Sequence, residues 1–385
     1  MKSVYLDYAA TTPVDREVTE SMLPFFGEIF ANPSSVHTPG QRARAAVEKT
    51  RSSAAALLGA AAEEIIFTSG GTESNNLAVK GLAAARRHLG DHIITSAIEH
   101  HAVLRPCETL EREGFRITRL NVDSAGLLDP SDVKKAMTDK TILISIMHAN
   151  NEIGTIQPIE EIGRMARERG VPFHTDAVQT FGHLPIDVSR LNVDALSASA
   201  HKFYGPKGAG FLYLRKGTRI LPQMEGGDQE RNRRASTHNV PGIVGLGKAA
   251  ELAEAGMAAE MKRLTEMRNF AVERILGEIG QAHLNGHPSA RLPNNINVRF
   301  DGVEGEALLF SLDMAGIACS SGSACTSSSV DPSHVLAAIG LARQAAHSSL
   351  RFSLGRGTTG GDIEYLLETL AATVARLRSL SKRGA

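Results

Sequence analysis

The segment Ser199-Ala200-His201-Lys202-Phe203-Tyr204-Gly205-Pro206-Lys207-Gly208 places a lysine four residues beyond a run of mainly small and apolar residues, 193–198. Such a run is typical of a buried strand. A lysine beside a buried strand is costly to desolvate, so we expect the pKa of Lys202 to fall. A neutral amine can form a Schiff base with an aldehyde. Lys202 is therefore a candidate for attaching an aldehyde cofactor, of which pyridoxal phosphate is the common one.

Around this segment, short apolar runs alternate with amphipathic ones from about residue 60 to residue 250. The predicted strands are 65–67, 92–96, 142–147, 172–175, 194–197 and 210–214, and helical patterns between them cover 102–113, 130–137 and 159–169. This alternation predicts an α/β fold with a mainly parallel sheet and helices on both faces. Ligands of such sheets bind beyond the carboxyl ends of the strands. The residues that follow predicted strands are Thr72, His100, Asn151, Asp176 and Lys202.

The rest of the chain predicts a second, smaller unit. A helical pattern over 257–274 would bridge to it, followed by a strand over 295–300 and helices over 305–315 and 363–379. We expect a large cofactor-binding domain over 14–257 and a small α+β domain formed by 1–13 and 258–385. The Ser/Gly/Thr-rich stretch 320–329 has neither a helical nor a strand pattern, and we expect a mobile loop over about 319–331.

Composition excludes several classes of protein. The 385 residues include 42 basic and 42 acidic ones, so the formal net charge is zero and no basic field indicates direct nucleic-acid binding. The most apolar run, 141–147, is too short to span a bilayer, and Asp7 interrupts any signal peptide. We expect a cytoplasmic protein that does not bind a membrane. Three cysteines do not make a disulfide framework, which indicates free thiols.

A glycine pair marks a candidate phosphate site. Thr68-Ser69-Gly70-Gly71-Thr72-Glu73-Ser74-Asn75 follows a predicted strand and opens a helix. Glycines let the backbone approach an anion, and free helix N–H groups with a threonine hydroxyl can hold phosphate. The spacing matches neither a Walker loop nor G-x-G-x-x-G. The alternative is an ordinary strand–helix turn, and Lys202 together with Asp176 favours the phosphate site.

Two further strand ends carry side chains suited to the same cofactor. Asp176 could pair with the pyridinium nitrogen and keep the ring protonated, while Gln179 could bind the phenolic oxygen. The alternative for Asp176 alone is a helix N-cap. His100 could stack on the ring and move protons. Adjacent histidines rarely bind one ion, and no partner set is spaced for a metal, so we predict no intrinsic metal site.

Spacing alone does not decide the roles of two cysteines or choose between two arginines. Cys325 lies among small polar residues and is either a nucleophile or an incidental surface cysteine. Cys319, beside Ile317 and Ala318, fits a small buried residue. Arg351 is a candidate clamp for a substrate carboxylate through its bidentate fork, and Arg356 competes with it.

Taken together, the motifs give the chain a strong resemblance to a family. It resembles the cysteine desulfurases of the NifS/IscS type, within the class V aminotransferase group of pyridoxal phosphate enzymes. The motifs that carry the resemblance, in chain order, are Tyr5-Leu6-Asp7-Tyr8-Ala9-Ala10-Thr11-Thr12, Asn32-Pro33-Ser34-Ser35-Val36-His37, Gly71-Thr72-Glu73-Ser74-Asn75-Asn76, Asn150-Asn151-Glu152-Ile153-Gly154, His174-Thr175-Asp176-Ala177-Val178-Gln179, Ser199-Ala200-His201-Lys202 and Ser321-Gly322-Ser323-Ala324-Cys325-Thr326-Ser327. Small departures are Tyr8, where the NifS branch often has Asn, and a short tail after Leu377.

The resemblance implies a fold-type I homodimer and assigns a role to each candidate. Lys202 would carry the cofactor, Asp176 would pair with its pyridinium, and His100 would stack on its ring. Gln179 and Asn151 would bind the phenolic oxygen side, and Asn151 and Arg351 the substrate. The implied phosphate ligands are Gly71, Thr72, Ser199, His201 and, toward the other subunit, Thr237.

The implied reaction converts L-cysteine to L-alanine through an aldimine and a ketimine. Cys325 would take the sulfur as a persulfide and deliver it to an acceptor protein, such as a scaffold for iron–sulfur cluster assembly. Cys325 could also serve as a transient iron–sulfur ligand shared with that scaffold. The alternatives are a selenocysteine lyase or an aminotransferase, in which Cys325 would be dispensable.

Overall fold

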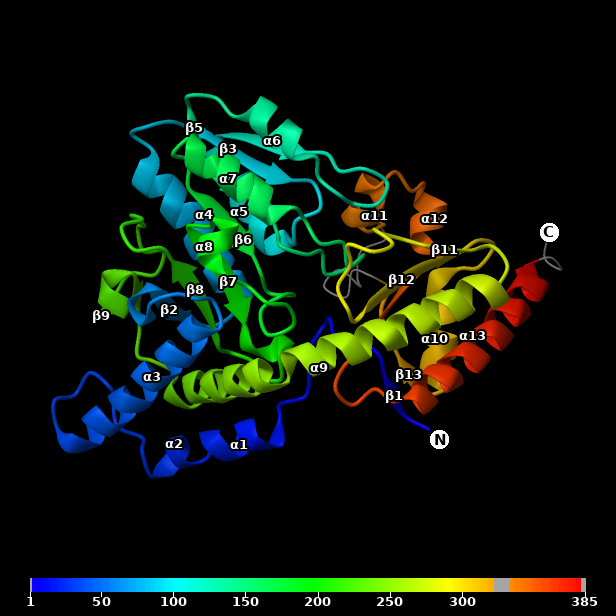
Figure 1. Ribbon diagram of the computed structural model, residues 1–385, viewed down its shortest axis with the longest axis horizontal. Helices are drawn as coiled ribbons and strands as arrows, with labels where there is room; N and C mark the ends of the chain where they lie inside the picture. Colours follow the sequence, from blue (N-terminus) through cyan, green and yellow to red (C-terminus); the bar gives the residue numbers. More distant parts are fainter. Residues whose placement is uncertain (1, 322–331, 382–385) are drawn as a thin grey trace.

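The computed structural model describes residues 2–321 and 332–381. Its larger lobe is built on a seven-stranded sheet with the strand order β2-β8-β7-β6-β5-β3-β4 (Figure 1). The strands are β2 (Ile65–Thr68), β3 (His92–Ser96), β4 (Arg116–Leu120), β5 (Thr141–Ser145), β6 (Phe173–Asp176), β7 (Ala195–Ser199) and β8 (Gly210–Leu214). Only β8 runs against its neighbours, so the expected mainly parallel sheet is confirmed.

The sheet is buried on both faces because its strands point apolar side chains in alternating directions. Ile65 and Phe67 belong to one hydrophobic cluster, whereas Ile66 between them belongs to another. The second cluster lies under α4 (Gly71–Arg86) and α5 (His101–Arg112). The first lies under the elements α3 (Thr38–Ala56), α6 (Pro130–Ala136), α7 (Ile159–Glu168) and α8 (Val188–Leu191) and the first half of α9 (Val240–Glu278).

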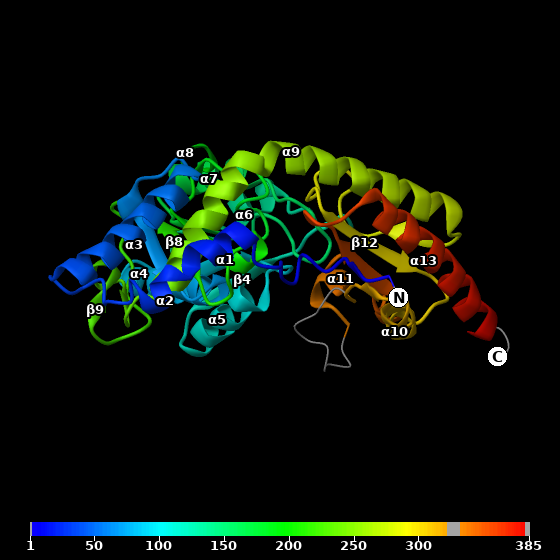
Figure 2. The same ribbon diagram turned by 90° about the horizontal axis from the view of Figure 1, so that it is seen from below.

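Helix α9 joins the two lobes and begins earlier than its sequence pattern predicts (Figure 2). It starts at Val240 instead of 257 and runs for 39 residues. Its first turns carry glycines, which weaken a helical pattern. These glycines are required by packing: a Cβ at Gly247 would lie 2.5 Å from Thr50 Oγ1 of α3, and one at Gly245 would lie 2.6 Å from Met22 Sδ.

The smaller lobe has an antiparallel sheet in the order β11-β12-β14, which shares one hydrophobic core with the second half of α9, α10 and α13. The N-terminal strand β1 pairs with β13, so residues at the start of the chain join this lobe's core. The bounds are β1 (Val4–Tyr5), β11 (Ala282–Leu284), β12 (Asn295–Phe300), α10 (Gly305–Met314), β13 (Ile317–Ala318), β14 (Ser349–Ser353) and α13 (Gly360–Ser381). The domain limits at residues 13 and 257 stay a prediction.

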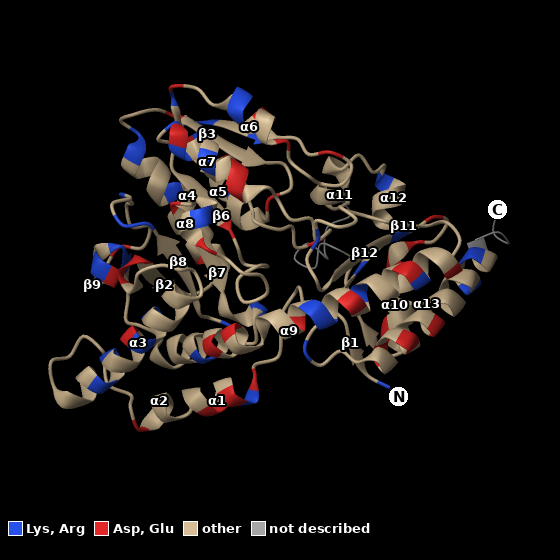
Figure 3. Ribbon diagram, viewed as in Figure 1, with Lys and Arg blue, Asp and Glu red and all other residues tan. Residues whose placement is uncertain are grey.

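Short elements complete the chain. They are α1 (Arg16–Met22), α2 (Pro24–Gly27), η1 (Ala62–Glu64), η2 (Ala200–Lys202), β9 (Asp228–Gln229), η3 (Glu230–Asn232), β10 (Arg234–Ala235), α11 (His334–Ala338) and α12 (Arg343–His347). Strand β4, which the apolar runs did not predict, is an edge strand with two arginines, and edge strands tolerate such charges. Basic and acidic side chains are interspersed over both lobes (Figure 3). Among the described helices, none is both long and apolar enough to cross a bilayer.

Candidate functional site

A pocket of about 250 Å³ lies beyond the carboxyl ends of the parallel strands. Ten of the residues predicted from the sequence line it: Gly71, Thr72, His100, Asn151, Asp176, Gln179, Ser199, His201, Lys202 and Arg351. The carboxyl ends of parallel strands meet at one edge of the sheet, which explains why residues so far apart in the chain share a pocket. Thr237 is exposed and does not line this pocket, and Cys325 lies outside the described residues.

Lys202 lies in the one-turn helix η2, three residues after β7, and is half-buried. Its Nζ donates hydrogen bonds to the carbonyl oxygens of Ala9 (2.6 Å) and Ala10 (2.7 Å). Gln179 Nε2 donates to the same Ala9 oxygen at 3.0 Å. The N-terminal segment therefore holds the lysine in place. The sequence did not predict this contact, and the expected lowering of the pKa of Lys202 stays a prediction.

Asp176 is the last residue of β6 and is almost completely buried in the pocket wall. Its Oδ2 accepts from Asn75 Nδ2 at 2.6 Å and its Oδ1 from the backbone N–H of Val178 at 2.9 Å. These bonds fix the carboxylate and suit it to a positively charged ring nitrogen. Asn75 also lines the pocket, and its buried Oδ1 has no hydrogen-bond partner among the described residues. Asn75 belongs to the motif 71–76 that contributes to the family resemblance, but no role was predicted for it.

The start of α4 forms a cradle for an anion. Gly71 is the first residue of this helix, whose N-cap, Gly70, has no side chain to bind the free N–H groups. A Cβ at Gly71 would lie 2.6 Å from Val178 Cγ2, so only glycine fits there. His201, the residue before Lys202, forms a hydrogen bond with Thr11 Oγ1 through its Nδ1 at 3.2 Å. Burial and the ammonium groups of Lys202 and Lys207 lower the pKa of His201 to about 4.

Histidines form another part of the wall. His100 is the N-cap of α5, and its Nδ1 accepts the backbone N–H of Ala102 at 3.0 Å. His101 lies 4.7 Å from His334, centroid to centroid, and both line the pocket. Burial, followed by the proximity of His334 and His100, lowers the pKa of His101. No sequence pattern indicated His334, because it lies on α11, far along the chain from the other pocket residues.

The structure separates the two candidate arginines. Arg351 lines the pocket, where its Nη2 bonds Asp7 Oδ1 at 2.8 Å and its Nη1 bonds the carbonyl of Asn151 at 2.9 Å. Arg356 does not line the pocket. It instead bonds Glu260 at 2.7 Å and stacks 4.1 Å from the centroid of the Tyr204 ring. Of the two arginines, Arg351 is therefore the one whose side chain lies at the pocket.

Two of the three cysteines are poor nucleophiles. Cys107 is fully buried in α5, and burial raises the pKa of its thiol to about 12. Burial, with the nearby Asp7 carboxylate, likewise raises the pKa of Cys319 to about 12. Both thiols remain protonated at neutral pH. Within residues 2–321 and 332–381, no cluster of three or more His, Cys, Asp or Glu side chains could hold a metal.

The pocket fits pyridoxal phosphate. A lysine amine, a buried carboxylate held by two donors and a glycine-opened helix start face one cavity, and these are the groups that an aldehyde, a pyridinium and a phosphate require. The pocket thus offers a suitable partner for the aldehyde, the ring nitrogen and the phosphate of pyridoxal phosphate.

Comparisons with known proteins point to one group of enzymes. The family model described as "Aminotransferase class-V" matches residues 4–366. "Cysteine desulfurase IscS" of Dictyoglomus turgidum is 56% identical over 380 residues, covering 99% of this chain and 96% of that protein. A solved structure titled "NIFS-LIKE PROTEIN" has a TM-score of 0.92 and 38% identity, covering 98% of this chain and 100% of the other. Another, titled "SspA in complex with cysteine", has a TM-score of 0.83 and 42% identity, covering 91% and 99%.

Proposed function

This chain belongs to the class V aminotransferase family, and we propose that it is a pyridoxal phosphate-dependent cysteine desulfurase that converts L-cysteine to L-alanine. The observation that carries the proposal is the convergence of Lys202, Asp176 and the Gly71–Thr72 cradle in one pocket of a chain so similar to named desulfurases. The same relatives favour a desulfurase over a selenocysteine lyase or an aminotransferase.

The residues around the pocket divide into groups that would hold separate parts of the cofactor. Lys202 would bind its aldehyde carbon, and Asp176, fixed by Asn75, would pair with its ring nitrogen. His100 would stack on the ring. Gln179 and Asn151 would bind the phenolic oxygen side, whereas the phosphate would lie against Gly71, Thr72, Ser199 and His201. When bound, the cofactor supplies an electron sink that makes the Cα proton of an amino acid acidic.

The chain's own residues would perform the remaining work. Arg351 would bind the substrate carboxylate with help from Asn151, and Lys202 Nζ would take and return the Cα proton. Cys325 Sγ, as a thiolate, would attack the substrate sulfur and form a new S–S bond. The electron pair of the broken C–S bond would stay with the substrate carbon, which gains a proton and becomes the methyl group of alanine. The sulfur would remain on Cys325 as a persulfide.

Partners and location are further parts of the proposal. Leu23, Phe26, Phe30 and Val36 are each more than half exposed and lie close together in sequence, and this apolar surface supports the homodimer. Thr237, exposed outside its own pocket, would reach the phosphate bound in the partner subunit. The persulfide sulfur would go to an acceptor protein, such as an iron–sulfur scaffold, with Cys325 as a transient cluster ligand. We propose a cytoplasmic location, where thiols stay reduced.

The decisive experiment measures alanine and sulfide release from L-cysteine in the presence of a thiol reductant. Wild-type protein, Cys325→Ser and the matched control Cys319→Ser are each checked for the visible absorption of bound cofactor. We expect all three to bind the cofactor, with turnover lost only in Cys325→Ser. Full turnover in Cys325→Ser would exclude the persulfide route and leave a direct lyase.

A further inference from the structure

A surface segment of the large lobe, residues 228–238, has an unusual backbone. Glu230, Arg231, Asn232 and Ser236 are not glycine, yet their φ angles are 47°, 58°, 63° and 79°. Side chains disfavour this left-handed region, so such a conformation persists only where surrounding contacts impose it. The contacts that impose it here centre on Glu230.

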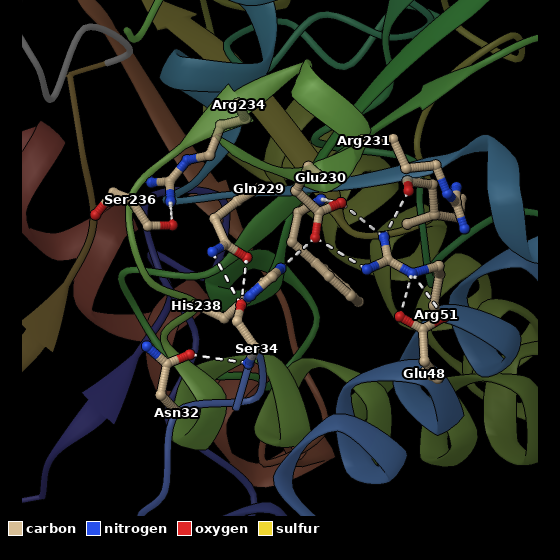
Figure 4. A network of polar contacts seen from close by, with 12 residues as sticks. Asn32, Ser34, Glu48, Arg51, Gln229, Glu230, Arg231, Arg234, Ser236 and His238 are labelled. Atoms are coloured by element: carbon tan, nitrogen blue, oxygen red, sulfur yellow. Dashed lines mark hydrogen bonds and ion pairs between the residues drawn. The ribbon is translucent and has the colours of Figure 1, made fainter. Parts of the chain in front are cut away.

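The Glu230 side chain is only 1% exposed, and its carboxylate accepts four hydrogen bonds (Figure 4). Arg51 of α3 donates Nη1 to Oε2 at 2.7 Å and Nη2 to Oε1 at 2.9 Å. The backbone N–H of Phe67 in β2 donates to Oε2 at 3.1 Å, and His238 Nε2 to Oε1 at 2.5 Å. One buried carboxylate thus ties the end of the segment to a helix and a strand of the rigid core.

The charge of Glu230 makes this tie strong. Burial alone would raise its pKa, but hydrogen bonds from His238 and Arg51 outweigh burial and lower the pKa to about 2. The carboxylate is therefore ionised at neutral pH, and hydrogen bonds to an ionised group are about twice as strong as neutral ones. A second ion pair, between Arg234 Nε and Glu73 Oε1 at 2.9 Å, ties the middle of the segment to the first turn of α4.

We propose that Glu230 and His238 are positioning residues that hold Thr237 in the orientation needed to bind the phosphate of the partner subunit's cofactor. The inference rests on the proposed function, which gives Thr237 that contact. Thr237 stands between Ser236, with its left-handed backbone, and His238, which is bound to Glu230. Because both neighbours are held, the Thr237 backbone is already in place before the phosphate binds, which lowers the ordering cost of binding.

The test measures the dissociation constant of pyridoxal phosphate, titrated into apo-protein and followed by its visible absorption. We expect Thr237→Ala to raise it by about tenfold, the size of one lost charged hydrogen bond. Glu230→Gln and His238→Ala should raise it by a similar factor. His238→Gln should stay near wild type, since its amide N–H can replace Nε2. The matched control is Glu48→Gln, which removes the charge of another partner of Arg51 but does not contact the segment.

A double variant separates positioning from general damage. Thr237→Ala combined with Glu230→Gln should bind the cofactor no more weakly than Thr237→Ala alone, because both act through one contact. Multiplied effects, or a wild-type dissociation constant in Glu230→Gln and His238→Ala, would overturn the positioning role. No effect of Thr237→Ala would instead contradict the phosphate contact in the proposed function. Alanine release by wild-type protein tests the reaction itself independently.

Discussion

His100 Nδ1 accepts the backbone N–H of Ala102 at 3.0 Å, so the side chain caps the start of helix α5. In neutral imidazole the nitrogen that accepts carries no proton, so the proton is on Nε2. Protonating Nδ1 would point its N–H at the backbone N–H of Ala102, and the hydrogen bond between them would be lost. His100 is thus better suited to donate a hydrogen bond from Nε2 than to accept a proton from a thiol.

Two amide variants distinguish these roles. His100→Asn keeps an oxygen near Nδ1 and should retain stability but lose turnover. His100→Gln places an N–H near Nε2 and should retain more turnover, while losing about 0.5–2 kcal/mol of stability with the cap. Steady-state kinetics and thermal unfolding measure both. If the ring acts as a base, both variants should lose turnover equally, by about 10²–10⁴-fold.

Arg351 and Arg356 form a matched pair for testing substrate binding. Arg351→Lys keeps the charge but loses the fork that bonds Asp7 and the Asn151 carbonyl, so we expect KM for L-cysteine to rise at least about tenfold. Arg356→Lys, outside the pocket, should leave KM unchanged. A rise in KM for Arg356→Lys alone would transfer the carboxylate site to Arg356.

Asn75 offers a test of how Asp176 is held. Asn75→Ala removes the 2.6 Å hydrogen bond to Asp176 Oδ2 and should weaken cofactor binding without removing the carboxylate. Asp176→Asn removes the charge itself and should lower turnover much more than it lowers cofactor occupancy. Cofactor titration together with alanine release separates the two effects. Equal turnover in wild type and Asp176→Asn would remove the ring-nitrogen contact from the mechanism.

The buried carboxyl of Glu99 should make the free energy of unfolding depend on pH. Its carboxyl is fully buried, and burial raises its pKa from 4.5 to about 8, although hydrogen bonds from Ser96 and Met147 lower it. The folded state therefore binds a proton that the unfolded chain releases above pH 4.5, so this contribution falls as pH rises from about 4.5 to about 8.

Glu99→Gln keeps an oxygen for Ser96 and the Met147 N–H but cannot ionise. Relative to wild type, this variant should become progressively more stable between pH 5 and pH 8. Denaturant unfolding at several pH values measures the difference. A constant difference across that range would show that Glu99 titrates normally.

The sequence by itself determined that the sheet is mainly parallel and which residues gather at the ends of its strands. Strand periodicity is local, and parallel strands bring their carboxyl ends to one edge, so Thr72, His100, Asn151, Asp176 and Lys202 could be predicted to meet. All five line the pocket. The early start of α9 was not predictable, because glycines that look like helix breakers are there to admit Thr50 and Met22.

Only the tertiary structure decided how these side chains are held. The carbonyls of Ala9 and Ala10 that bind Lys202, the amide of Asn75 on Asp176 and the carboxylate of Glu230 under His238 all come from distant parts of the chain. The choice between Arg351 and Arg356 likewise followed from which one faces the pocket. Such pairings depend on three-dimensional packing, and a backbone carbonyl leaves no mark in the residue types, so no local pattern encodes them.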